Sequence, residues 1–402
     1  MTPLLGSLEG LRVVAVEQAV AAPLCSRHLA ELGADVVKVE RLDGDFARGY
    51  DTMVSGQATH FVWLNAGKRS VALDLKAPQG REALARLLER ADVLVSNLGP
   101  GSIERLVDLG ALEAANPGLV RCAITGYGAE GPYAGRKSYD LLVQGEAGVT
   151  MSTGTTGSPA KCGVSLADLA GGLYAFSAVL AALVERERTG RGASLDISLL
   201  DCLAEWMMPL LLAQRYGGRT PPPAGTRHAT ITPYGPFQAA DGAVVNIAVQ
   251  NDGQWRALCA EVLDSPGLAE VPAYRTNEGR LAERDAVEAS VAAAVGRLDS
   301  ATLRDRLDAA SVPWGDLNDV AQVVTHPQLT ERGRWRPVRL PGGGQAEILA
   351  APFAPSAKGA PAGGVRRVPG LGEDSAGVLG EVGYSAGELD ALARLGVIPG
   401  RP

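Results

Sequence analysis

Apolar and polar positions follow two patterns over the first third of the chain. Short runs rich in valine predict buried strands at residues 11–17, 34–40, 70–76, 92–97 and 119–128. Between them, apolar residues recur at helical spacing and predict helices at residues 23–32, 78–90 and after Gly101. Strands that alternate with helices of this length predict parallel βαβ units. We therefore expect an α/β fold with a large, doubly wound, Rossmann-like parallel sheet.

The carboxyl ends of these strands are the expected ligand-binding edge, because open parallel sheets bind ligands there. The ends fall at residues 18–22, 41–45, 76, 97–101 and 125–127. The first strand-to-helix turn reads EQAVAAP and lacks the GxGxxG motif that lets a backbone approach a pyrophosphate. A nicotinamide or flavin enzyme is therefore disfavoured.

The rest of the chain predicts a smaller domain. A long helix is expected over residues 168–187 and an apolar helix over 198–216, before turn-rich segments. Strands at 235–239 and 244–248 then precede helices at 254–263, 280–297 and 300–310. We expect a large α/β domain (residues 1–224), a small α+β domain (225–330) and a return segment (331–402) that completes the large domain.

Composition narrows the class of protein. With 402 residues, 46% of them hydrophobic, the chain can bury one large core or two ordinary ones. A formal charge of −7 argues against a nucleic-acid-binding protein, which normally carries a basic face. Small anionic ligands are still compatible with this charge, because a few local Arg and Lys side chains suffice for them.

Cysteine spacing and segment polarity indicate a soluble, cytoplasmic protein without a membrane partner. The five cysteines form no CxxC pair and the four histidines show no metal-ligand spacing, so neither a disulfide framework nor a metal site is expected. The amino terminus lacks the basic and then apolar layout of a signal peptide. Residues 202–214 are apolar, but Glu205 and Pro209 interrupt them and they are too short to span a bilayer.

Six motifs, in one order along nearly the whole chain, resemble those of one enzyme family. They are LEGLRVV (8–14), LGADVVKVER (32–41), NAGKRSVALDLK (65–76), NLGPGSIERL (97–106), SLADLAGGLYA with ERERTGRG (165–175 and 185–192) and PGLGED (369–374). In these motifs the chain resembles the class III coenzyme A (CoA) transferases, the family of formyl-CoA transferase and α-methylacyl-CoA racemase. The resemblance implies an enzyme that moves CoA between an acyl-CoA and a carboxylic acid, without a tightly bound cofactor, and an interlocked homodimer.

Asp168 is the candidate nucleophile. From the sequence alone, an Asp that opens a helix is an ordinary N-cap, and a helix amino terminus also helps to keep a carboxylate ionised. The resemblance places the family's catalytic Asp on this residue, where it would form an aspartyl anhydride and then an aspartyl-CoA thioester. Gly171 and Gly172 are unfavourable inside a helix, so we expect them to allow close approach of another chain or of the pantetheine arm.

The CoA contacts follow from the resemblance, position by position. The turn Gln18, Ala19, Val20 and Ala21 would lie against adenine and pantetheine. The nucleotide pocket would be lined by Leu73, Asn97 and Leu98. Positive charge for the phosphates would come from Arg41, Lys76, Arg105 and Lys137. Each basic residue alone reads equally as a solvated loop charge, but most of them fall at or just past strand ends, where an anion should bind.

Substrate contacts separate the branches of the family. The racemase branch carries a His immediately before the position of Asp140, whereas this chain has Tyr139, whose pKa is ordinarily near 10. Racemisation is therefore disfavoured, although Tyr139 could equally be a packing aromatic. Residues 225–242 lack the glycine run of formyl-CoA transferase and more resemble branches that handle dicarboxylic acids. There Arg227 or His228 could pair a second carboxylate, or both could be ordinary loop residues.

Three functions stay open at this point: a CoA transferase, an acyl-CoA racemase or isomerase, and a non-catalytic acyl-CoA-binding protein. The first needs an acceptor acid and the Asp168 carboxylate. The second exchanges an α-proton and needs no acceptor. The third binds CoA without turnover. A nicotinamide dehydrogenase is a distant fourth.

Overall fold

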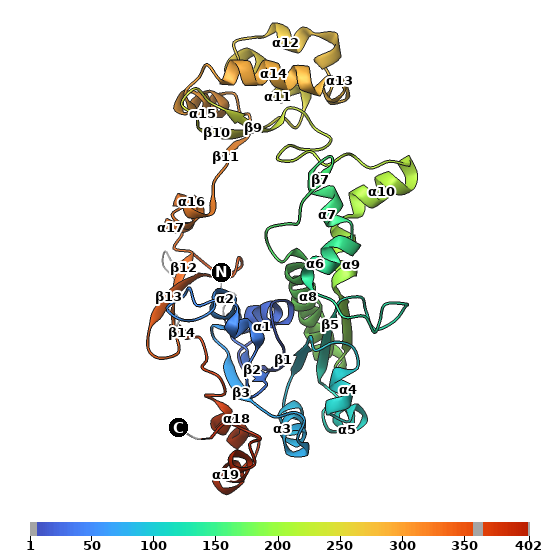
Figure 1. The fold of residues 1–402 in the computed structure, drawn as a ribbon, viewed down its shortest axis with the longest axis vertical. Coiled ribbons are helices and arrows are strands. Elements are labelled where there is room, and N and C mark those ends of the chain that lie inside the picture. Colours follow the sequence, from blue (N-terminus) through green and yellow to red (C-terminus); the bar gives the residue numbers. More distant parts are fainter. Residues whose placement is uncertain (1–5, 357–364, 401–402) are drawn as a thin grey trace. The chain divides into compact units, whose positions relative to one another are not determined.

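The computed structural model of the chain describes residues 6–356 and 365–400, which pack into two compact units (Figure 1). Unit 1 holds the described residues of Met1–Ala147, Cys162–Met207 and Pro327–Pro402. Unit 2 holds Gly148–Lys161 and Met208–His326. The chain therefore leaves unit 1 and returns to it twice.

Unit 1 is built on a six-stranded parallel sheet in the order β3-β2-β1-β4-β5-β8. The strands are β1 (Arg12–Val16), β2 (Asp35–Glu40), β3 (Arg69–Ala72), β4 (Val93–Ser96), β5 (Val120–Thr125) and β8 (Ser194–Ser198). Strand order reverses between β1 and β4, which confirms the doubly wound sheet. A ligand crevice is expected beyond the carboxyl ends of those two strands.

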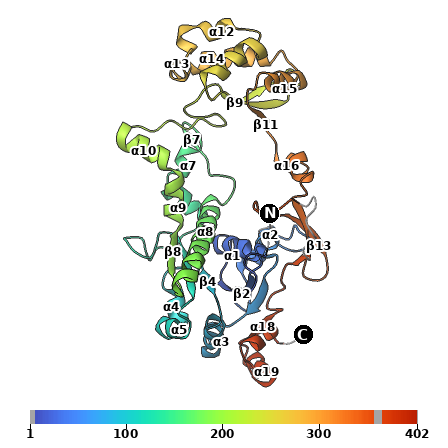
Figure 2. The same ribbon diagram turned by 180° about the vertical axis from the view of Figure 1, so that it is seen from behind.

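Helices cover both faces of this sheet. The described helices of unit 1 are α1 (Ala21–Glu31), α2 (Thr59–Asn65), α3 (Pro78–Leu88), α4 (Ser102–Leu106), α5 (Leu109–Ala115), α6 (Asp140–Glu146), α8 (Leu166–Thr189), α9 (Leu199–Trp206), α17 (Pro327–Thr330), α18 (Ser375–Glu381) and α19 (Ala386–Arg394), with the 3-10 turn η1 (Phe46–Gly49). Figures 1 and 2 show α1 and α8 side by side, and the two helices are in contact. The carboxyl-terminal part adds a small sheet, β13-β12-β14, from β12 (Trp335–Arg339), β13 (Gln345–Leu349) and β14 (Arg366–Arg367).

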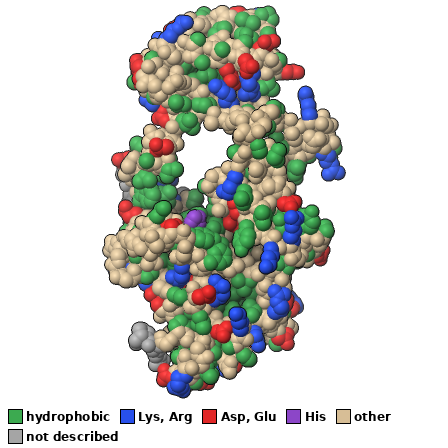
Figure 3. All heavy atoms as spheres, in the orientation of Figure 1, with side chains coloured by type: hydrophobic (Ala, Val, Ile, Leu, Met, Phe, Trp, Pro, Cys, Tyr) green, Lys and Arg blue, Asp and Glu red, His purple; other side chains and the backbone are tan. Residues whose placement is uncertain are grey.

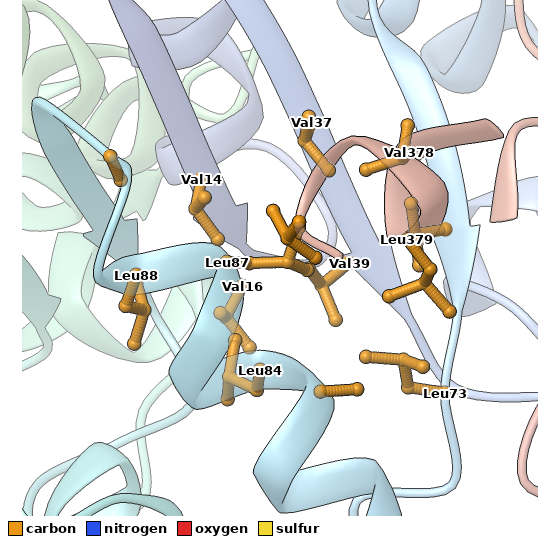
Figure 4. Close-up of a cluster of buried hydrophobic side chains, with 14 of the residues drawn as sticks. Val14, Val16, Val37, Val39, Leu73, Leu84, Leu87, Leu88, Val378 and Leu379 are labelled. Carbon is orange, nitrogen blue, oxygen red and sulfur yellow. The ribbon is translucent and has the colours of Figure 1, made fainter. Parts of the chain in front are cut away.

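The main core of unit 1 follows from the alternation of side chains along its strands. Val14 and Val16 of β1 point to one face of the sheet, where they pack with Leu84 and Leu87 of α3 (Figure 4). Leu379 of α18 joins the same cluster although it lies far away in sequence. The carboxyl-terminal segment therefore completes the core of unit 1.

Unit 2 is a small α+β body. A three-stranded antiparallel sheet, β11-β10-β9, is formed by β9 (Tyr234–Gln238), β10 (Val244–Ala248) and β11 (Trp314–Asp316). Its core contains Trp255 and valines of α14. The other elements are α7 (Val149–Ser152), β6 (Gly154–Thr155), β7 (Ser158–Pro159), α10 (Met208–Gly217), α11 (Asp252–Ala257), the π-helix η2 (Leu258–Val262), α12 (Gly267–Glu270), η3 (Pro272–Tyr274), α13 (Asn277–Ala282), α14 (Arg284–Val295), α15 (Ser300–Ala309) and α16 (Val320–Val324).

Two helix predictions were wrong in their continuity. The helix expected over residues 198–216 is two helices, α9 and α10, separated at Met207. Pro209 follows at once and has no backbone N–H for a continuous ladder. The helix expected over 280–297 begins earlier and breaks at Glu283 between α13 and α14.

The compact units also divide the chain differently from the expected domains. Residues 148–161 and 208–224 pack in unit 2, whereas the sequence placed both segments in the large domain. A bridge between Thr155 and Ala224 joins these two segments to each other. The domain boundaries at 224 and 330 stay predictions.

Helix α8 is the one helix of the described residues that is long and apolar enough to cross a membrane by length and composition alone. In the structure it packs on α1 and β5 within unit 1. Its small residues are buried there: Ala170, Gly171, Gly172 and Ala175. Its apolar character is accounted for in part by this packing.

The two glycines of α8 admit parts of this same chain. A Cβ at Gly172 would lie 2.6 Å from the carbonyl oxygen of Ala21 and 2.9 Å from Cβ of Leu24, both in α1. A Cβ at Gly171 would instead meet the end of the Leu199 side chain. The expectation that these glycines admit another chain or the pantetheine arm is therefore replaced by close packing against α1 and Leu199.

This difference predicts unequal costs for two alanine substitutions. The Cβ of Gly172→Ala would meet the backbone of α1, so this substitution should lower the free energy of unfolding by about 1–3 kcal/mol. This cost exceeds the roughly 1 kcal/mol by which Ala stabilises a helix relative to Gly. Gly171→Ala meets a flexible side-chain end and should cost less. Urea unfolding of both variants measures the difference; equal stabilities would contradict the packing described.

Candidate active site

Asp168 lies at the third position of α8, in its first turn. The N-cap of this helix is Ser165, so the interpretation of Asp168 as an N-cap is wrong. Among the described residues, no hydrogen bond or ion pair to the Asp168 carboxylate is found, and the side chain is half-buried. A carboxylate in a helix amino terminus that has no partner is available for chemistry.

Asp140 is the residue whose charge acts on the Asp168 carboxylate. It is buried at the start of α6, where its Oδ1 accepts the backbone N–H of Ala167 (2.8 Å) and its Oδ2 accepts Nε2 of Gln144 (2.8 Å). Burial, and then the charge of Asp140, raise the pKa of Asp168 to about 7. These effects oppose the helix amino terminus, which was expected to keep the carboxylate ionised. Near neutral pH, Asp168 is therefore poised between its two forms.

Two tyrosines accompany this pair. Tyr139 is the N-cap residue of α6, next to Asp140, and its side chain is exposed. Tyr50 ends η1 and stacks edge-on against His60 with ring centroids 5.5 Å apart. Burial, and then the charges of Asp45 and Asp168, raise the pKa of Tyr50 to about 12. Its phenol keeps its proton and is a hydrogen-bond donor in this region.

The turn between β1 and α1 lies at the switch point of the sheet. Asn97, just after β4, forms two hydrogen bonds with the backbone of Gln18. Its Oδ1 accepts the N–H of Gln18 (2.9 Å) and its Nδ2 donates to the carbonyl of Gln18 (2.8 Å). Ala19 has a φ of 61°, in the left-handed region that costs an L-residue about 1–2 kcal/mol. Val20 is the N-cap of α1, and Ala21 is its first residue. The structure thus brings Gln18 and Asn97 together, as their expected shared site requires.

The remaining residues of the expected nucleotide pocket differ in accessibility. Leu73 is fully buried in the main core of unit 1, so its side chain packs in the protein interior. Leu98 is half-buried at the edge of that core. The side chain of Asn97 is occupied by the turn. Of the three, Leu98 is the residue whose side chain is neither fully buried nor hydrogen-bonded to the turn.

The four basic candidates are exposed and follow carboxyl ends of strands. Arg41 comes directly after β2 and pairs with Asp43 at 3.3 Å. Arg105 lies in α4, and its guanidinium donates to Oγ of Ser102. Lys76 follows β3, and Lys137 lies in the connection after β5. On the face drawn in Figure 3, the described Lys and Arg side chains are interspersed with acidic and hydrophobic ones over unit 1.

Arg227 and His228 lie in unit 2, and their side chains are engaged differently. Nη1 of Arg227 is 2.9 Å from Oε2 of Glu288, and its guanidinium lies over the ring of Phe237. The ring of His228 stacks on Tyr234 with centroids 5.1 Å apart, and its Nδ1 accepts the N–H of Thr230. Because Nδ1 is the acceptor, Nε2 carries the proton of the neutral ring. His228 therefore presents a donor, whereas the charge of Arg227 is already paired.

The sequence reasoning missed Asp140, Tyr50 and Asp45 as members of this region. Asp140 follows Tyr139 directly, so its place at the start of a helix beside the candidate nucleophile could have been considered. Asp45 and Tyr50 fall at and just beyond the carboxyl end of a predicted strand, which was a usable signal. Among the described residues, no group of His, Cys, Asp and Glu side chains is arranged to hold a metal ion.

The pKa of Asp168 predicts how this carboxyl titrates. Below pH 7 the folded protein holds a proton that an ordinary Asp, with a pKa of 3.8, would release, so this group's contribution to stability is lost as pH rises towards 7. Asp140→Asn removes the neighbouring charge and should lower the pKa of Asp168. Carbon-13 NMR of labelled Asp carboxyls measures both midpoints. Asp92→Asn, before β4 at the opposite edge of the sheet, is the control, and an unchanged Asp168 midpoint in Asp140→Asn would contradict the coupling.

Comparisons with known proteins identify the family of the chain. The family described as CoA-transferase family III matches residues 8–375. A succinyl-CoA:mesaconate CoA-transferase of Haloarcula marismortui is 36% identical over 396 residues, covering 95% of this chain and 98% of that protein. A succinate–glutarate CoA-transferase of Agrobacterium fabrum is 34% identical, covering 81% of this chain and 84% of that protein.

Solved structures give the same result for the fold. The crystal structure of a CAIB/BAIF family protein from Brucella suis is 33% identical and superposes with a TM-score of 0.75, covering 93% of this chain and 99% of that one. A D175A mutant of Rv3272 from Mycobacterium tuberculosis is 28% identical with a TM-score of 0.81, covering 94% and 99%. The chain belongs to CoA-transferase family III and is an enzyme of that family.

Proposed function

We propose that this enzyme moves CoA from a dicarboxylyl-CoA such as succinyl-CoA to a second carboxylic acid, with Asp168 as the nucleophile. The observation that carries the proposal is the half-buried Asp168 carboxylate, which has no hydrogen-bond partner among the described residues and lies beside Asp140. The names of relatives at about 35% identity, which act on succinate, glutarate or mesaconate, support the class of acid.

The chemistry exchanges activated acyl groups. Ionised Asp168 attacks the thioester carbonyl and expels CoA thiolate, which leaves a mixed aspartyl–acyl anhydride. The thiolate attacks the aspartyl carbonyl and releases the donor acid, which leaves an aspartyl-CoA thioester. The acceptor carboxylate then attacks this thioester, and the same two steps in reverse deliver the new acyl-CoA and free Asp168. The sequence of steps balances without a metal, ATP or a tightly bound cofactor.

The surroundings of Asp168 favour the covalent intermediates. The free carboxylate is opposed by burial and by the charge of Asp140. Acylation removes the charge of Asp168 and relieves both effects, so free energy stored in the resting site is released as the intermediate forms. The carboxylate of Asp140 is fixed by its two hydrogen bonds and can exert this repulsion without moving away.

The CoA site is proposed at the switch point of the sheet. Gln18, Ala19, Val20 and Ala21 would contact adenine and pantetheine, with Asn97 and Leu98 beside them and the backbone of Leu73 nearby. Phosphate charge would be met by the exposed bases at the same edge: Arg41, Lys76, Arg105 and Lys137. The exposure of these bases and their place after strand ends support the assignment.

Tyr139 of unit 1 and His228 of unit 2 are each proposed, separately, as a contact of the substrate acid. Tyr139 is exposed beside Asp140, and His228 presents a donor at Nε2. Arg227 is a weaker candidate than the sequence suggested, because Glu288 already pairs its charge. A distal carboxylate on a dicarboxylic acid is the partner that a neutral imidazole donor suits.

The enzyme is further proposed to be an interlocked homodimer in the cytoplasm. Four of its cysteines are buried thiols, which fits a reducing compartment. Helix α10 buries none of its residues and exposes Met208, Leu211, Leu212 and Tyr216, an apolar surface that suits a second chain.

Sedimentation at micromolar concentration should give twice the mass of the chain, and Leu212→Glu should weaken the dimer; a wild-type monomer would contradict the proposal.

Transfer is separated from racemisation by one experiment in deuterated water. With succinyl-CoA and glutarate, we expect glutaryl-CoA and succinate in equal amounts, no deuterium at the α-carbon and no product without glutarate. Asp168→Ala should abolish transfer. Asp201→Ala, at the same third position of α9, is the matched control and should keep it. Acceptor-independent deuterium exchange would favour the racemase, and binding without turnover would favour a CoA-binding protein.

The same assay tests the substrate contact. His228→Ala should raise KM for glutarate severalfold and leave KM for butyrate, which has no second carboxylate, within about twofold. An equal change for both acids would contradict a role in recognising the distal carboxylate.

A further inference from the structure

Three consecutive residues of the turn between β1 and α1 form hydrogen bonds with side chains from other parts of the fold. Glu17 is buried, where its Oε1 accepts Nζ of Lys68 (2.7 Å) and its Oε2 accepts Oγ of Ser26 (2.6 Å). Gln18 is gripped by Asn97 through both of its backbone groups. The N–H of Ala19 donates to Oδ1 of Asp45 (3.1 Å). Each residue of the turn is fixed from a different part of the fold.

Asp45 is the member of this set that touches the unusual backbone. It is buried after β2, and its Oδ1 accepts two backbone N–H groups, from Ala19 and from Ala47 (2.9 Å). Its Oδ2 accepts Nζ of Lys38 at 2.9 Å, in an ion pair whose side chains are both fully buried. Ala19 has a left-handed φ of 61°, and without this acceptor its N–H would have no partner among the described residues.

Charge balance explains why so polar a group lies in the interior. Lys38 also approaches Glu17, and Arg48 pairs with Glu40 at 2.7 Å. Burial alone would lower the pKa of Lys38, but Glu17 and Asp45 together raise it above its usual value. Three buried carboxylates thus face three cations: Lys38, Lys68 and Arg48. Loss of Asp45 alone would leave this cluster with one positive charge more than its carboxylates balance, which is strongly destabilising in the interior.

We propose that Asp45 is a positioning residue for CoA binding: its Oδ1 holds Ala19 in the left-handed conformation that shapes the turn for the ligand. The inference rests on the proposed CoA site. The same oxygen caps η1, whose C-cap residue is Tyr50, and the charges of Asp45 and Asp168 both act on the phenol of Tyr50. One carboxylate oxygen therefore joins the CoA-binding turn to the segment beside the nucleophile. In a dinucleotide-binding fold, glycines allow such a turn; here a buried acceptor does.

The test is a pair of double variants that differ only in the acceptor. Lys38→Met with Asp45→Asn removes the ion pair but keeps an oxygen for Ala19, whereas Lys38→Met with Asp45→Leu removes both. Each keeps the balance of buried charge. Isothermal titration with CoA should give a Kd within about threefold of wild type for the first and at least about tenfold weaker for the second, or about 1.4 kcal/mol. If the leucine variant does not fold, Asp45→Ala in the same background replaces it.

Controls and readouts distinguish the possible outcomes. The control is Asp92→Asn. In the wild type, the Asp92 carboxylate also accepts a backbone N–H and forms an ion pair, but at the opposite edge of the sheet, so this variant should bind CoA like wild type. Thermal unfolding of every variant identifies a merely structural loss. If the two folded double variants bind CoA with equal affinity, whether near that of the wild type or equally weakened, the role of Asp45 is overturned. Failure of the wild type to bind CoA would instead overturn the proposed function and this inference with it.

Discussion

The chemistry that we propose for this enzyme depends on one unfavourable interaction: the Asp168 carboxylate is partly buried and is repelled by the charge of Asp140. Asp140 cannot move away, because Ala167 and Gln144 each donate a hydrogen bond to one of its oxygens. Asp168 has no such partner among the described residues, and its pKa rises to about 7. A carboxylate held in this way is neither a stable structural anion nor a permanently neutral acid. In the proposed mechanism this makes it both reactive and easily acylated.

The fold supplies this arrangement through helix packing. Helix α8 approaches α1 closely because Gly172 has no side chain to separate them. Helix α1 in turn starts from the turn that Glu17, Asn97 and Asp45 hold. The proposed nucleophile and the proposed CoA site are therefore positioned by the same two helices. A doubly wound sheet does not determine function by itself, and we propose that the side chains at the switch point specialise this chain for CoA.

Much of this could be predicted from the sequence. The valine-rich runs gave the strands of unit 1 because both faces of a parallel sheet are buried, which leaves a simple apolar pattern. The family was predicted because six motifs occur in its order, whereas the role of Asp168 as nucleophile stays a prediction. Leu73 shows the limit of assigning site residues by resemblance to a family. Its place in the motif suggested a contact with the nucleotide, but its side chain lies in the core of unit 1. The break before Pro209 had a local signal in the proline itself. The partners of Asp140, Asp45 and Tyr50 depend instead on contacts between distant segments. A single sequence contains no signal for such contacts beyond strand-end position.

The most direct test of the account is covalent capture of the nucleophile. The protein is incubated with succinyl-CoA, quenched with hydroxylamine and digested, and the peptide that contains Asp168 is compared with that of Asp168→Asn by mass spectrometry. The account predicts a hydroxamate on Asp168 in the wild type, formed from the anhydride or the thioester, and none in the variant. An unmodified Asp168 in protein that is turning over substrate would contradict covalent catalysis by this residue.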